Sequence, residues 1–415
     1  MFLTRYSEYV NTIETRCVIA GGGPAGMMLG YMLARAGIEV HVLEKWPDFF
    51  RDFRGDTIHP STMEILHELG LLEGFLKLPH NKTRKMSGYF GGNLYTIADI
   101  TRLHVREPYI AFIPQWDFLN YIAGAAQQFP SFHLHMETDA TDVIWENGRA
   151  VGVRAQHKDE AFDFRSELVI GADGRHSTIR DTMAPEIEAL AAPFDVLWFK
   201  LAAVAEDPEQ SFGFLNNGKV LVTLDRGDYW QCGFLIQKGH FEQIKQDGLE
   251  KFKADIATLA PLLAPSAQKL ASFDEVKMLS VSLDHVKQWY KDGVLCIGDS
   301  AHAMSPLGGV GINVAIHDAV AAGNLLIPAF RRGMPTVSDL ASVQARREKP
   351  VRKMQHVQAF LQNNLLIPYL NTHSDTHVPL PLRILKWFPF LQAIPARFVG
   401  IGFNPEHIDA GLFDR

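Results

Sequence analysis

Residues 16–45 read RCVIAGGGPAGMMLGYMLARAGIEVHVLEK, and this stretch decides the fold class. A short apolar run at 17–20 leads into three glycines with GxGxxG spacing: Gly21, Gly23 and Gly26. A helical pattern of apolar residues follows and stops at Gly37, and residues 38–43 then predict a second strand. The stretch therefore predicts a β–α–β unit of a Rossmann-like α/β fold.

The three glycines have separate expected roles in binding a dinucleotide. Gly21 permits a tight turn, Gly23 lets the backbone approach a pyrophosphate, and Gly26 lets the helix lie close to the strand. The helix start at Pro24 then presents the free N–H groups of the residues after the proline, beginning with Ala25, to phosphates. The alternative is a glycine-rich turn without a ligand, and the strand, helix and following carboxylate together disfavour it.

That carboxylate is Glu44, which ends the second strand 18 residues after Gly26. An acid at this distance accepts hydrogen bonds from an adenosine ribose and disfavours a 2′-phosphate. Glu44 and the adjacent Lys45 are therefore expected cofactor contacts.

The composition is that of a large enzyme with two lobes. The chain has 415 residues, a net charge of −7 and a pI near 6.2, so no nucleic-acid partner is expected. Three widely separated cysteines without a CxxC pair favour buried thiols in a reducing compartment: Cys17, Cys232 and Cys296. No metal-ligand spacing was recognised, so no metal site is predicted.

The two ends of the chain predict a cytoplasmic protein. Residues 1–10 lack the features of a secretory signal, and no apolar run reaches transmembrane length. Residues 378–403 are rich in large apolar side chains and could lie on a membrane surface. Several prolines break this stretch, which favours packing against the main body, so membrane contact is not expected.

Residues 51–75 follow the β–α–β unit and contain Arg54. An arginine on a loop beside a dinucleotide site can neutralise phosphate or lie against the ring of a cofactor, and we favour this over a surface ion pair with a neighbouring aspartate. A helix is expected through Leu69, with Ser61 and Glu64 forming a capping box at its start.

Two further glycine-marked segments follow strand-like runs. Residues 171–180 read GADGRHSTIR, in which Asp173 and Gly174 predict a sharp turn into a helix. Residues 294–326 read VLCIGDSAHAMSPLGGVGINVAIHDAVAAGNLL.

In the second of these segments a strand delivers Gly298 and Asp299 to a loop, and a long helix is expected to begin near Gly311. Asp299 is placed to bind sugar-like hydroxyls. Residues 306–313 are placed to offer backbone N–H groups to an anionic or electron-rich ring edge.

The order of the three segments resembles that of the single-component flavoprotein aromatic hydroxylases, the p-hydroxybenzoate hydroxylase-like superfamily. That family has GxGxxG near the N-terminus, a DG pair near the middle and a GD pair in the last third, and the resemblance covers residues 15–345. It implies an α/β FAD-binding lobe with an inserted, mostly antiparallel substrate sheet, followed by C-terminal helices. It also implies non-covalent FAD, NADPH or NADH as a transient reductant, and O2 and a small aromatic molecule as substrates.

The resemblance also implies roles for individual residues. The GxGxxG glycines and Glu44 would bind the ADP half of FAD, and Arg54 would contact the flavin. Gln115, at the start of the helix in PQWDFLNYIAGAA, resembles a polar residue that reaches the cofactor. Asp173 and Gly174 are associated with FAD and the nicotinamide, and Asp299 with the ribityl chain. The loop beside the isoalloxazine would comprise Pro306, Leu307, Gly308, Gly309, Gly311, Ile312 and Asn313.

The expected reaction follows from the same resemblance. Reduced nicotinamide transfers hydride to FAD, and a flavin C4a-hydroperoxide formed with O2 hydroxylates an electron-rich aromatic or polyketide-like ring. Backbone N–H groups of residues 307–313 are expected to stabilise negative charge near flavin N1 and O2. No catalytic base is assigned: His59, His302 or Tyr89 could deprotonate a phenol, although a supporting role for His302 is favoured.

One departure from the family concerns this loop. The chain has LGGVGIN where relatives often have a GQG-type sequence, so Gly309 stands where a larger residue is common. Backbone donors survive that change, but a different contour beside the flavin is expected.

The expected FAD lobe comprises residues 1–80, 106–190 and 285–337, the substrate lobe 81–105 and 191–284, and a C-terminal helical region 338–415. Alternating apolar runs between 195 and 281 predict the strands of the substrate lobe, with helices at 240–264. Five aromatic residues are candidates for its pocket, each with the alternative of a core position: Trp198, Phe199, Tyr229, Trp230 and Phe234.

Rival functions differ in features that the sequence can test. A flavin-dependent halogenase would carry a WxWxIP-like segment, and a disulfide reductase would need a second dinucleotide fold and a CxxC pair; neither is found. A reductase or desaturase acting on an isoprenoid or quinone-type lipid stays open, with the apolar C-terminal stretch as its hint, as does a non-enzymatic flavin sensor. The expected oligomeric state is a monomer or a homodimer.

Overall fold

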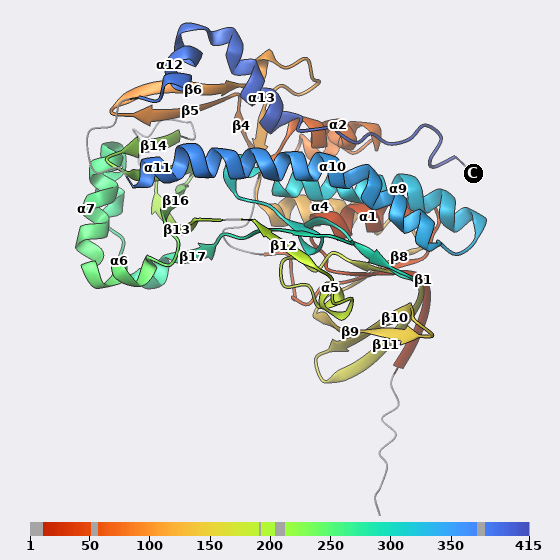
Figure 1. Cartoon of the computed structure of the whole chain (residues 1–415). Coiled ribbons are helices and arrows are strands. Elements are labelled where there is room, and N and C mark those ends of the chain that lie inside the picture. Colours follow the sequence, from red (N-terminus) through yellow and green to blue (C-terminus); the bar gives the residue numbers. More distant parts are fainter. Residues whose placement is uncertain (1–10, 51–56, 191, 204–211, 372–377, 415) are drawn as a thin grey trace, which may run out of the picture.

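The computed structural model describes residues 11–50, 57–190, 192–203, 212–371 and 378–414. Its largest element is an eight-stranded sheet (Figure 1) formed by β1 Asn11–Ala20, β2 Val40–Leu43, β8 Phe132–His135, β9 Thr138–Glu146, β10 Arg149–His157, β11 Glu160–Gly171, β19 Tyr290–Lys291 and β20 Val294–Cys296. Strands β20, β11, β1, β2 and β8 lie side by side and run parallel, whereas β9, β10 and β19 add antiparallel pairs. Residues 17–20 and all of β2 are buried, as expected for parallel strands covered on both faces.

Helix α1 (Pro24–Arg35) begins at the GxGxxG turn and confirms the expected β–α–β unit. Pro24 occupies the first helical turn, where its missing N–H costs no hydrogen bond. Gly37 follows the helix with a φ of 76°, in the left-handed region that glycine adopts without strain. A methyl group at Gly30 would lie 2.9 Å from Cγ2 of Val42, so the helix lies very close to β2.

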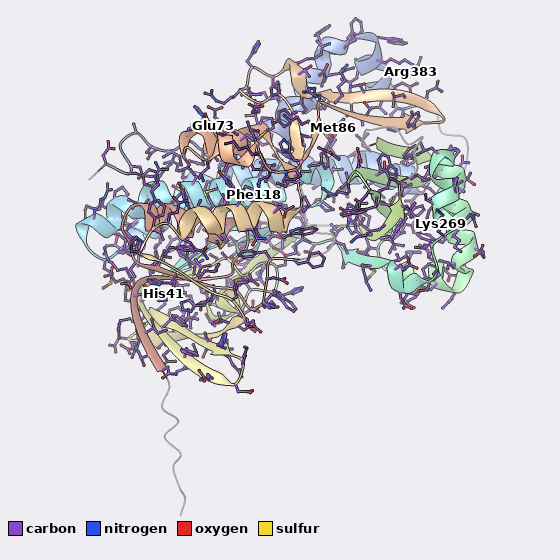
Figure 2. The ribbon with its side chains drawn as sticks, turned by 180° about the vertical axis from the view of Figure 1, so that it is seen from behind. His41, Glu73, Met86, Phe118, Lys269 and Arg383 are labelled. Atoms are coloured by element: carbon purple, nitrogen blue, oxygen red, sulfur yellow. The ribbon has the colours of Figure 1, made fainter. Side chains whose placement is uncertain are left out.

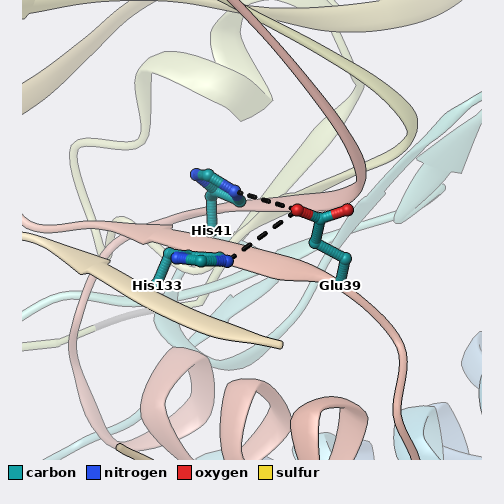
Figure 3. Close-up of side chains that lie close together, drawn as sticks. All are labelled: Glu39, His41 and His133. Atoms are coloured by element: carbon teal, nitrogen blue, oxygen red, sulfur yellow. Dashed lines mark ion pairs between the residues drawn. The ribbon is translucent and has the colours of Figure 1, made fainter. Parts of the chain in front are cut away.

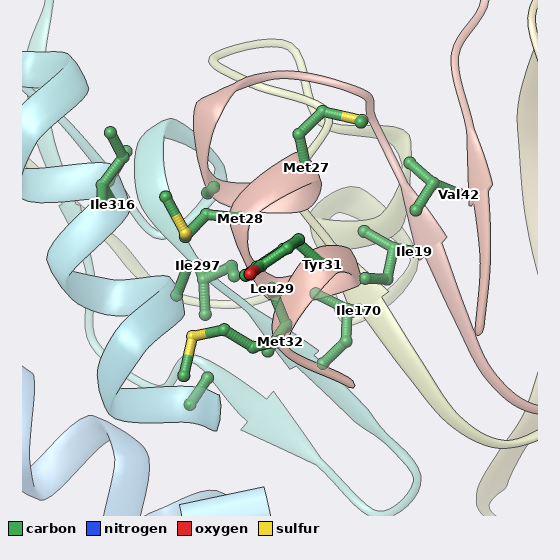
Figure 4. Close-up of a cluster of buried hydrophobic side chains, with 14 of the residues drawn as sticks. Ile19, Met27, Met28, Leu29, Tyr31, Met32, Val42, Ile170, Ile297 and Ile316 are labelled. Carbon is green, nitrogen blue, oxygen red and sulfur yellow. The ribbon is translucent and has the colours of Figure 1, made fainter. Parts of the chain in front are cut away.

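Helix α9 (Gly311–Arg332) packs against α1 and begins at the expected residue. Met28 and Met32 of α1 extend toward α9, with Met28 on the side of Ile316 and Met32 farther along the helix (Figure 4). A methyl group at Gly323 of α9 would lie 2.4 Å from Cε of Met32, which shows how closely the two helices approach. Among the described residues, 307–332 form the one helical stretch long and apolar enough to cross a membrane, and 89% of its most apolar part is buried inside the fold. It is therefore a core helix of this fold.

A second, mostly antiparallel sheet has the strand order β17, β13, β16, β15, β14, β5, β6. Its strands are β5 Lys85–Phe90, β6 Asn93–Asp99, β13 Phe194–Ala202, β14 Phe212–Asn216, β15 Lys219–Asp225, β16 Tyr229–Gln237 and β17 Lys277–Ser280. Three helices cover one of its faces: α6 Phe241–Asp247, α7 Leu249–Leu259 and α8 Ala264–Ala267. Figure 2 shows Lys269 beside these helices, on the opposite side of the molecule from His41 in the first sheet.

Two small sheets and the remaining helices complete the fold. The small sheets comprise β3 Thr57–Ile58, β7 Ile110–Phe112 and β4 Asn81–Thr83, and β12 Ile187–Leu190, β18 Leu283–Val286 and β21 His302–Ala303. The other helices are α2 Pro60–Glu68, α3 Leu72–Phe75, α4 Gln115–Ala126, α5 Thr178–Thr182, α10 Val337–Leu361, α11 Ile367–Leu370, α12 Leu380–Trp387 and α13 Ala393–Gly400. Helix α10 runs from the first sheet to the second (Figure 1).

The C-terminal helices contact the β5–β6 hairpin but leave apolar side chains exposed. Helices α12 and α13 both pack against β6, as expected for a tail that folds onto the main body. Five large side chains nevertheless remain exposed: Leu380, Trp387, Phe388, Phe390 and Ile394.

The expected capping box at Ser61 is wrong. Helix α2 begins at Pro60 with His59 at the N-cap, and no side chain caps it. Proline at the first helical position presets the backbone angle φ for a helix that starts one residue before Ser61, so Ser61 lies inside the first turn and not at the N-cap position. Ser61 is buried in the first turn, and the Glu64 carboxylate lies 3.7 Å from Arg106 instead.

Candidate functional site

The three glycine-marked segments meet at one edge of the first sheet. They follow the carboxyl ends of β1, β11 and β20, which are neighbours in the sheet. The N–H of Ala172 donates to the Ala20 carbonyl at 2.8 Å, and the N–H of Ile297 donates to the Gly171 carbonyl at 2.9 Å. In α/β folds the crevice beyond the carboxyl ends of such strands is where ligands bind.

The GxGxxG glycines differ in what surrounds them. Gly21 has a φ of 104°, and a methyl group there would lie 2.3 Å from the Ala172 carbonyl oxygen. A methyl group at Gly26 would lie 2.0 Å from the Gly21 carbonyl oxygen, so the turn and the helix are in direct contact. Apart from Gly23 itself and its chain neighbours, no atom of the described residues lies within 4 Å of the position that a methyl group would take at Gly23. The turn thus leaves open space at Gly23, beside the first N–H groups of α1, and this cradle fits the pyrophosphate of a dinucleotide.

Glu44 lies beside this turn and is 9% exposed. Its Oε2 accepts a hydrogen bond from the Gly22 N–H at 3.0 Å, and its Oε1 accepts one from the Trp46 N–H at 3.2 Å. These contacts fix the carboxylate at the end of β2, where a ribose hydroxyl can approach. Lys45 is exposed, with its Nζ 5.5 Å from the centre of the Trp46 ring.

Two further residues, Arg54 and Gln115, are expected to contact the cofactor. Arg54 lies outside the described residues. Gln115 is the first residue of α4 and is buried.

Asp173 braces the DG turn. Its Oδ1 accepts a hydrogen bond from the Ser177 hydroxyl at 2.5 Å, and its Oδ2 accepts one from the Ile179 N–H at 3.2 Å. Burial raises the pKa of this carboxyl above its usual value, against the lowering effect of those donors. Gly174 follows with a φ of 87°, which permits the sharp turn into α5.

Arg175 joins the DG segment to the GD segment, and the sequence analysis did not single it out. Its Nε donates to Oδ2 of Asp299 at 3.1 Å, and its Nη2 donates to the Met304 carbonyl at 3.0 Å. Its Nη1 is buried and has no hydrogen-bond partner within the part of the chain that is described. Arg175 thus orients the Asp299 carboxylate and retains one donor at the edge of the site. The sequence feature that could have marked Arg175 as a residue of the site is its position directly after the DG pair, Asp173 and Gly174.

The loop at 306–313 has a glycine-dependent shape. Gly308 and Gly309 have φ angles of 82° and 65°. The Thr57 hydroxyl donates to the Gly309 carbonyl at 2.8 Å, and a methyl group at Gly309 would lie 2.7 Å from that hydroxyl oxygen. A side chain at Gly309 would therefore displace Thr57. The position where relatives often have the larger residue of a GQG-type sequence is thus a glycine here, and the Thr57 hydroxyl packs against it.

The backbone donors of this loop are fewer than expected. The N–H of Leu307 donates to the Ser305 hydroxyl at 3.2 Å, and the N–H of Gly309 donates to the Pro306 carbonyl at 3.0 Å. Helix α9 begins at Gly311, just after the 3₁₀ turn Leu307–Gly309, in which Gly308 has non-helical backbone angles, so the N–H groups of its first turn lack a regular α-helical turn before them. These N–H groups and the positive end of the α9 dipole are the donors that the loop can offer to a ligand.

The side chain of Asn313 holds the loop in place and has no free polar atom. Its Nδ2 donates to the Thr57 carbonyl at 3.0 Å, while its Oδ1 accepts from the His59 N–H at 2.9 Å and from the Thr62 hydroxyl at 2.8 Å. Asn313 therefore ties α9 to β3 and α2, and its backbone N–H is the group left for a cofactor.

The three candidate bases lie in different environments, and two of them are fully buried. His302 is 1% exposed and lies 2.5 Å from Oδ2 of Asp318, which also accepts the Gly298 N–H at 3.0 Å. Burial opposes ionisation of Asp318, but His302 and Arg347 outweigh it and lower its pKa to about 2. His302 thus supports the Gly298 turn.

The other two candidates also have protein contacts. His59 is 1% exposed, its Nδ1 lies 2.7 Å from the Val399 carbonyl, and burial lowers its pKa to about 4. Tyr89 is half-buried and stacks on Phe214 with ring centres 5.2 Å apart.

The aromatic side chains of the second sheet divide between its two faces. Phe199, Trp230 and Phe234 are buried against α6–α8, so these three take the core alternative and do not line a pocket. Trp198 lies on the opposite face, where a methyl group at Gly233 would lie 3.1 Å from its ring. Its Nε1 is buried without a hydrogen-bond partner among the described residues. Trp198 and Phe199 are adjacent in β13, so their side chains point to opposite faces of the sheet.

Comparison with known proteins gives concordant matches. A family model described as "FAD binding domain" matches residues 14–357. The chain is 31% identical to 6-methylpretetramide 4-monooxygenase from Streptomyces rimosus, over 85% of both chains. Its fold is similar to that of OxyS anhydrotetracycline hydroxylase from Streptomyces rimosus (TM-score 0.72, 21% identity, 96% of this chain and 78% of that one). It is also similar to that of p-nitrophenol 4-monooxygenase PnpA from Pseudomonas putida (TM-score 0.71, 19% identity, 92% and 99%).

Proposed function

The chain belongs to the FAD binding domain family and is an FAD-dependent monooxygenase, and we propose that it hydroxylates a ring of a fused aromatic polyketide. The observation that carries this substrate class is the 31% identity, over 85% of both chains, to an enzyme named for a pretetramide substrate. NAD(P)H is the reductant typical of the family, and O2 is the second substrate. We place the protein in the cytoplasm.

We assign FAD to the crevice at the carboxyl ends of β1, β11 and β20. When bound, FAD would provide the redox chemistry: it would accept hydride from NAD(P)H and activate O2. The chain supplies the binding groups: the open space at Gly23 with the start of α1 for the pyrophosphate, and Glu44 for the adenosine ribose. Asp299, oriented by Arg175, is assigned to the ribityl hydroxyls.

The start of α9 is assigned to the pyrimidine edge of the flavin. Its first N–H groups and the positive end of the helix dipole favour negative charge at that edge. Asn313, Thr57 and the two left-handed glycines fix these donors in advance, so no reorganisation is needed when charge develops. Neither buried histidine is assigned as a base, because both already contact protein acceptors.

The substrate is assigned to the face of the second sheet that carries Trp198. This face lies opposite α6–α8, and Trp198 packs there against the cluster that includes Val196 and Leu370. Its buried Nε1, without a partner among the described residues, is a donor suited to a carbonyl or phenol oxygen. We retain the division into an FAD lobe (1–80, 106–190, 285–337), a substrate lobe (81–105, 191–284) and a C-terminal helical region as part of this proposal.

The experiment that tests the function is a stoichiometry measurement. Purified FAD-loaded protein is mixed with NADH or NADPH and with each member of a panel of tetracyclic phenols, simple phenols and quinones. O2 uptake and NAD(P)H oxidation are followed, and the masses of the products are determined by mass spectrometry. We expect the tetracyclic phenols to stimulate oxidation, with one O2 consumed per NAD(P)H and a product 16 Da heavier, the mass of one oxygen atom. Formation of a reduced product without O2 uptake would favour the reductase alternative.

A further inference from the structure

Two strands at the edge of the first sheet bring a carboxylate and two imidazoles together. Glu39, just before β2, and His41, within it, are two residues apart and project from the same face. His133 of β8 is paired with His41 in the parallel register, so it projects from that face as well. The two imidazole centres lie 4.3 Å apart. Figure 3 shows both rings directed at the Glu39 carboxylate.

The spacing of the three donor atoms suits a shared cation better than direct hydrogen bonds. Oε1 of Glu39 lies 3.9 Å from Nε2 of His41 and 3.8 Å from Nε2 of His133, both too long for a hydrogen bond. All three atoms lie within 4.8 Å of one another. A tetrahedral ion with bonds of about 2.0–2.2 Å holds its ligand atoms about 3.3–3.6 Å apart, so only small side-chain movements are needed.

One side chain of the group is anchored and the other two are accessible. The side chain of His41 is 8% exposed, whereas those of His133 and Glu39 are 40% and 49% exposed. A cation can therefore reach the group from solvent, and the two exposed side chains can adjust to it. A fourth position, facing solvent, remains for water.

His135 provides the contact that a metal-binding imidazole needs on its far side. Nδ1 of His41 lies 2.9 Å from Nε2 of His135. When His41 donates its Nδ1–H to His135, the lone pair of its Nε2 is directed at the Glu39 side. A ligating histidine usually donates its other N–H to such an acceptor, which fixes the tautomer and the ring orientation.

We propose that Glu39, His41 and His133 bind a divalent transition metal ion, with Zn²⁺ as the ion best matched to two imidazoles and a carboxylate. Imidazole ligands select against Mg²⁺ and Ca²⁺, which prefer oxygen ligands throughout. The ion would link the edge strand β8 to β2. The site is separate from the proposed cofactor crevice: Glu39 and Glu44 are at opposite ends of β2, about 16 Å apart at the usual rise of a strand.

The sequence signal for this site is divided between two distant segments. EVH at 39–41 and HLH at 133–135 each place two potential ligands on one face of a strand. Only the pairing of β2 with β8 makes them one group. Neither segment alone has a metal-ligand spacing, and for this reason the sequence led to the expectation of no metal site.

The test is calorimetric titration of Zn²⁺ into the untagged, FAD-loaded protein after treatment with EDTA and dialysis. We expect one tight site per chain. Glu39→Gln and His133→Gln should each weaken it at least tenfold, and so should His135→Phe, which removes the acceptor for His41 but no ligand. The matched control is His240→Gln, since His240 is exposed and distant in sequence from the group.

Thermal unfolding supplies a second readout. Zn²⁺ should raise the Tm of the original protein and of His240→Gln, and should raise that of His133→Gln much less. Tight binding that is unchanged in both Glu39→Gln and His133→Gln, or the lack of any tight site, would overturn the proposal. Neither outcome bears on the monooxygenase reaction, because FAD content and NAD(P)H oxidation are measured separately.

Discussion

At the scale of single residues, Arg175 is the side chain that connects two of the three glycine-marked segments. It orients Asp299 through a charge-assisted hydrogen bond and also bonds the Met304 carbonyl. Its Nη1, which has no hydrogen-bond partner among the described residues, lies at the same edge of the sheet. A bound cofactor that reaches Asp299 therefore depends on an arginine 124 residues away in the chain.

We expect Arg175→Met to weaken FAD binding by about tenfold or more, since hydrogen bonds to charged groups contribute about 1.5–3 kcal/mol each. The measurement is titration of apoprotein with FAD, followed by the quenching of flavin fluorescence. Arg154→Met is the matched control, because Arg154 pairs with Asp142 on the exposed surface of β10 and such pairs contribute little. Equal FAD affinity in the two variants would show that Arg175 does not position the site.

Gly309 yields a second prediction at this scale. Gly309→Ala should strain a residue whose φ is 65° by about 1–2 kcal/mol and push the Thr57 hydroxyl away from the loop. We expect lower FAD affinity as well as a lower Tm. Gly37→Ala is the control, because Gly37 also has a positive φ but nothing lies within 4 Å of the added methyl group. It should lower the Tm and leave FAD affinity unchanged.

At the scale of elements, the position of α9 depends on a few side chains at its start. Asn313 bonds β3, α2 and the loop at once, so the helix terminus that faces the crevice is fixed from three sides. Farther along the same helix, Asn324 donates to the His407 carbonyl and accepts from the Asp409 N–H. The two asparagines thus anchor opposite parts of one helix.

Asn313→Ala should lower the free energy of unfolding by about 3 kcal/mol, because it leaves several buried backbone and hydroxyl groups unpaired. It should also weaken FAD binding, since the first turn of α9 loses its fixed position. Asn324→Ala should destabilise the chain to a comparable degree without affecting FAD. Chemical denaturation of the apoproteins and FAD titration separate the two effects, and loss of FAD affinity in both variants would contradict the prediction.

The elements that carry the site could largely be predicted, because each is marked locally. An apolar run followed by glycines in a turn specifies a strand end and a helix start, and β1, α1, β11, β20 and α9 lie where these signals put them. Contacts between segments could not be predicted in the same way. The Arg175–Asp299 pair and the group at Glu39, His41 and His133 depend on which strands are neighbours.

The second sheet shows the same limit for side-chain direction. Alternation in β13 predicted that Trp198 and Phe199 face opposite sides, but not which side faces the crevice. That choice depends on where α6–α8 pack, which the strand sequence itself does not specify.

At the scale of the whole molecule, buried neutral histidines make stability depend on pH. Burial lowers the pKa of His59 to about 4 and that of His317 to about 3, while an unfolded histidine titrates near 6.5. Between about pH 6.5 and 4 the unfolded chain binds protons that the folded chain does not. The free energy of unfolding should therefore fall as the pH falls through this window, by up to about 2.7 kcal/mol per pH unit for the two residues.

Chemical denaturation at pH 7.5, 6.5, 5.5 and 4.5 measures this slope. His317→Gln keeps an acceptor for the Glu406 N–H that bonds Nδ1 of His317, and it should make the slope shallower. Asp318 should not contribute in this range, because its lowered pKa affects stability only as the pH falls below about 4. A stability that is constant from pH 7.5 to 4.5 would contradict the prediction.

The strand order of the first sheet also has a consequence for how the protein is made. On the ribosome β1 emerges well before its neighbour β11, which ends at Gly171, and β20 and the loop carrying Asp299 follow more than 120 residues after that. While those residues are being made, the nascent chain must therefore hold an incomplete sheet with apolar edges, a state that favours aggregation or chaperone binding. Flavin capture should therefore follow the synthesis of residues 294–313, because the crevice that begins at β1 is complete only once β20 and the loop after it have been made.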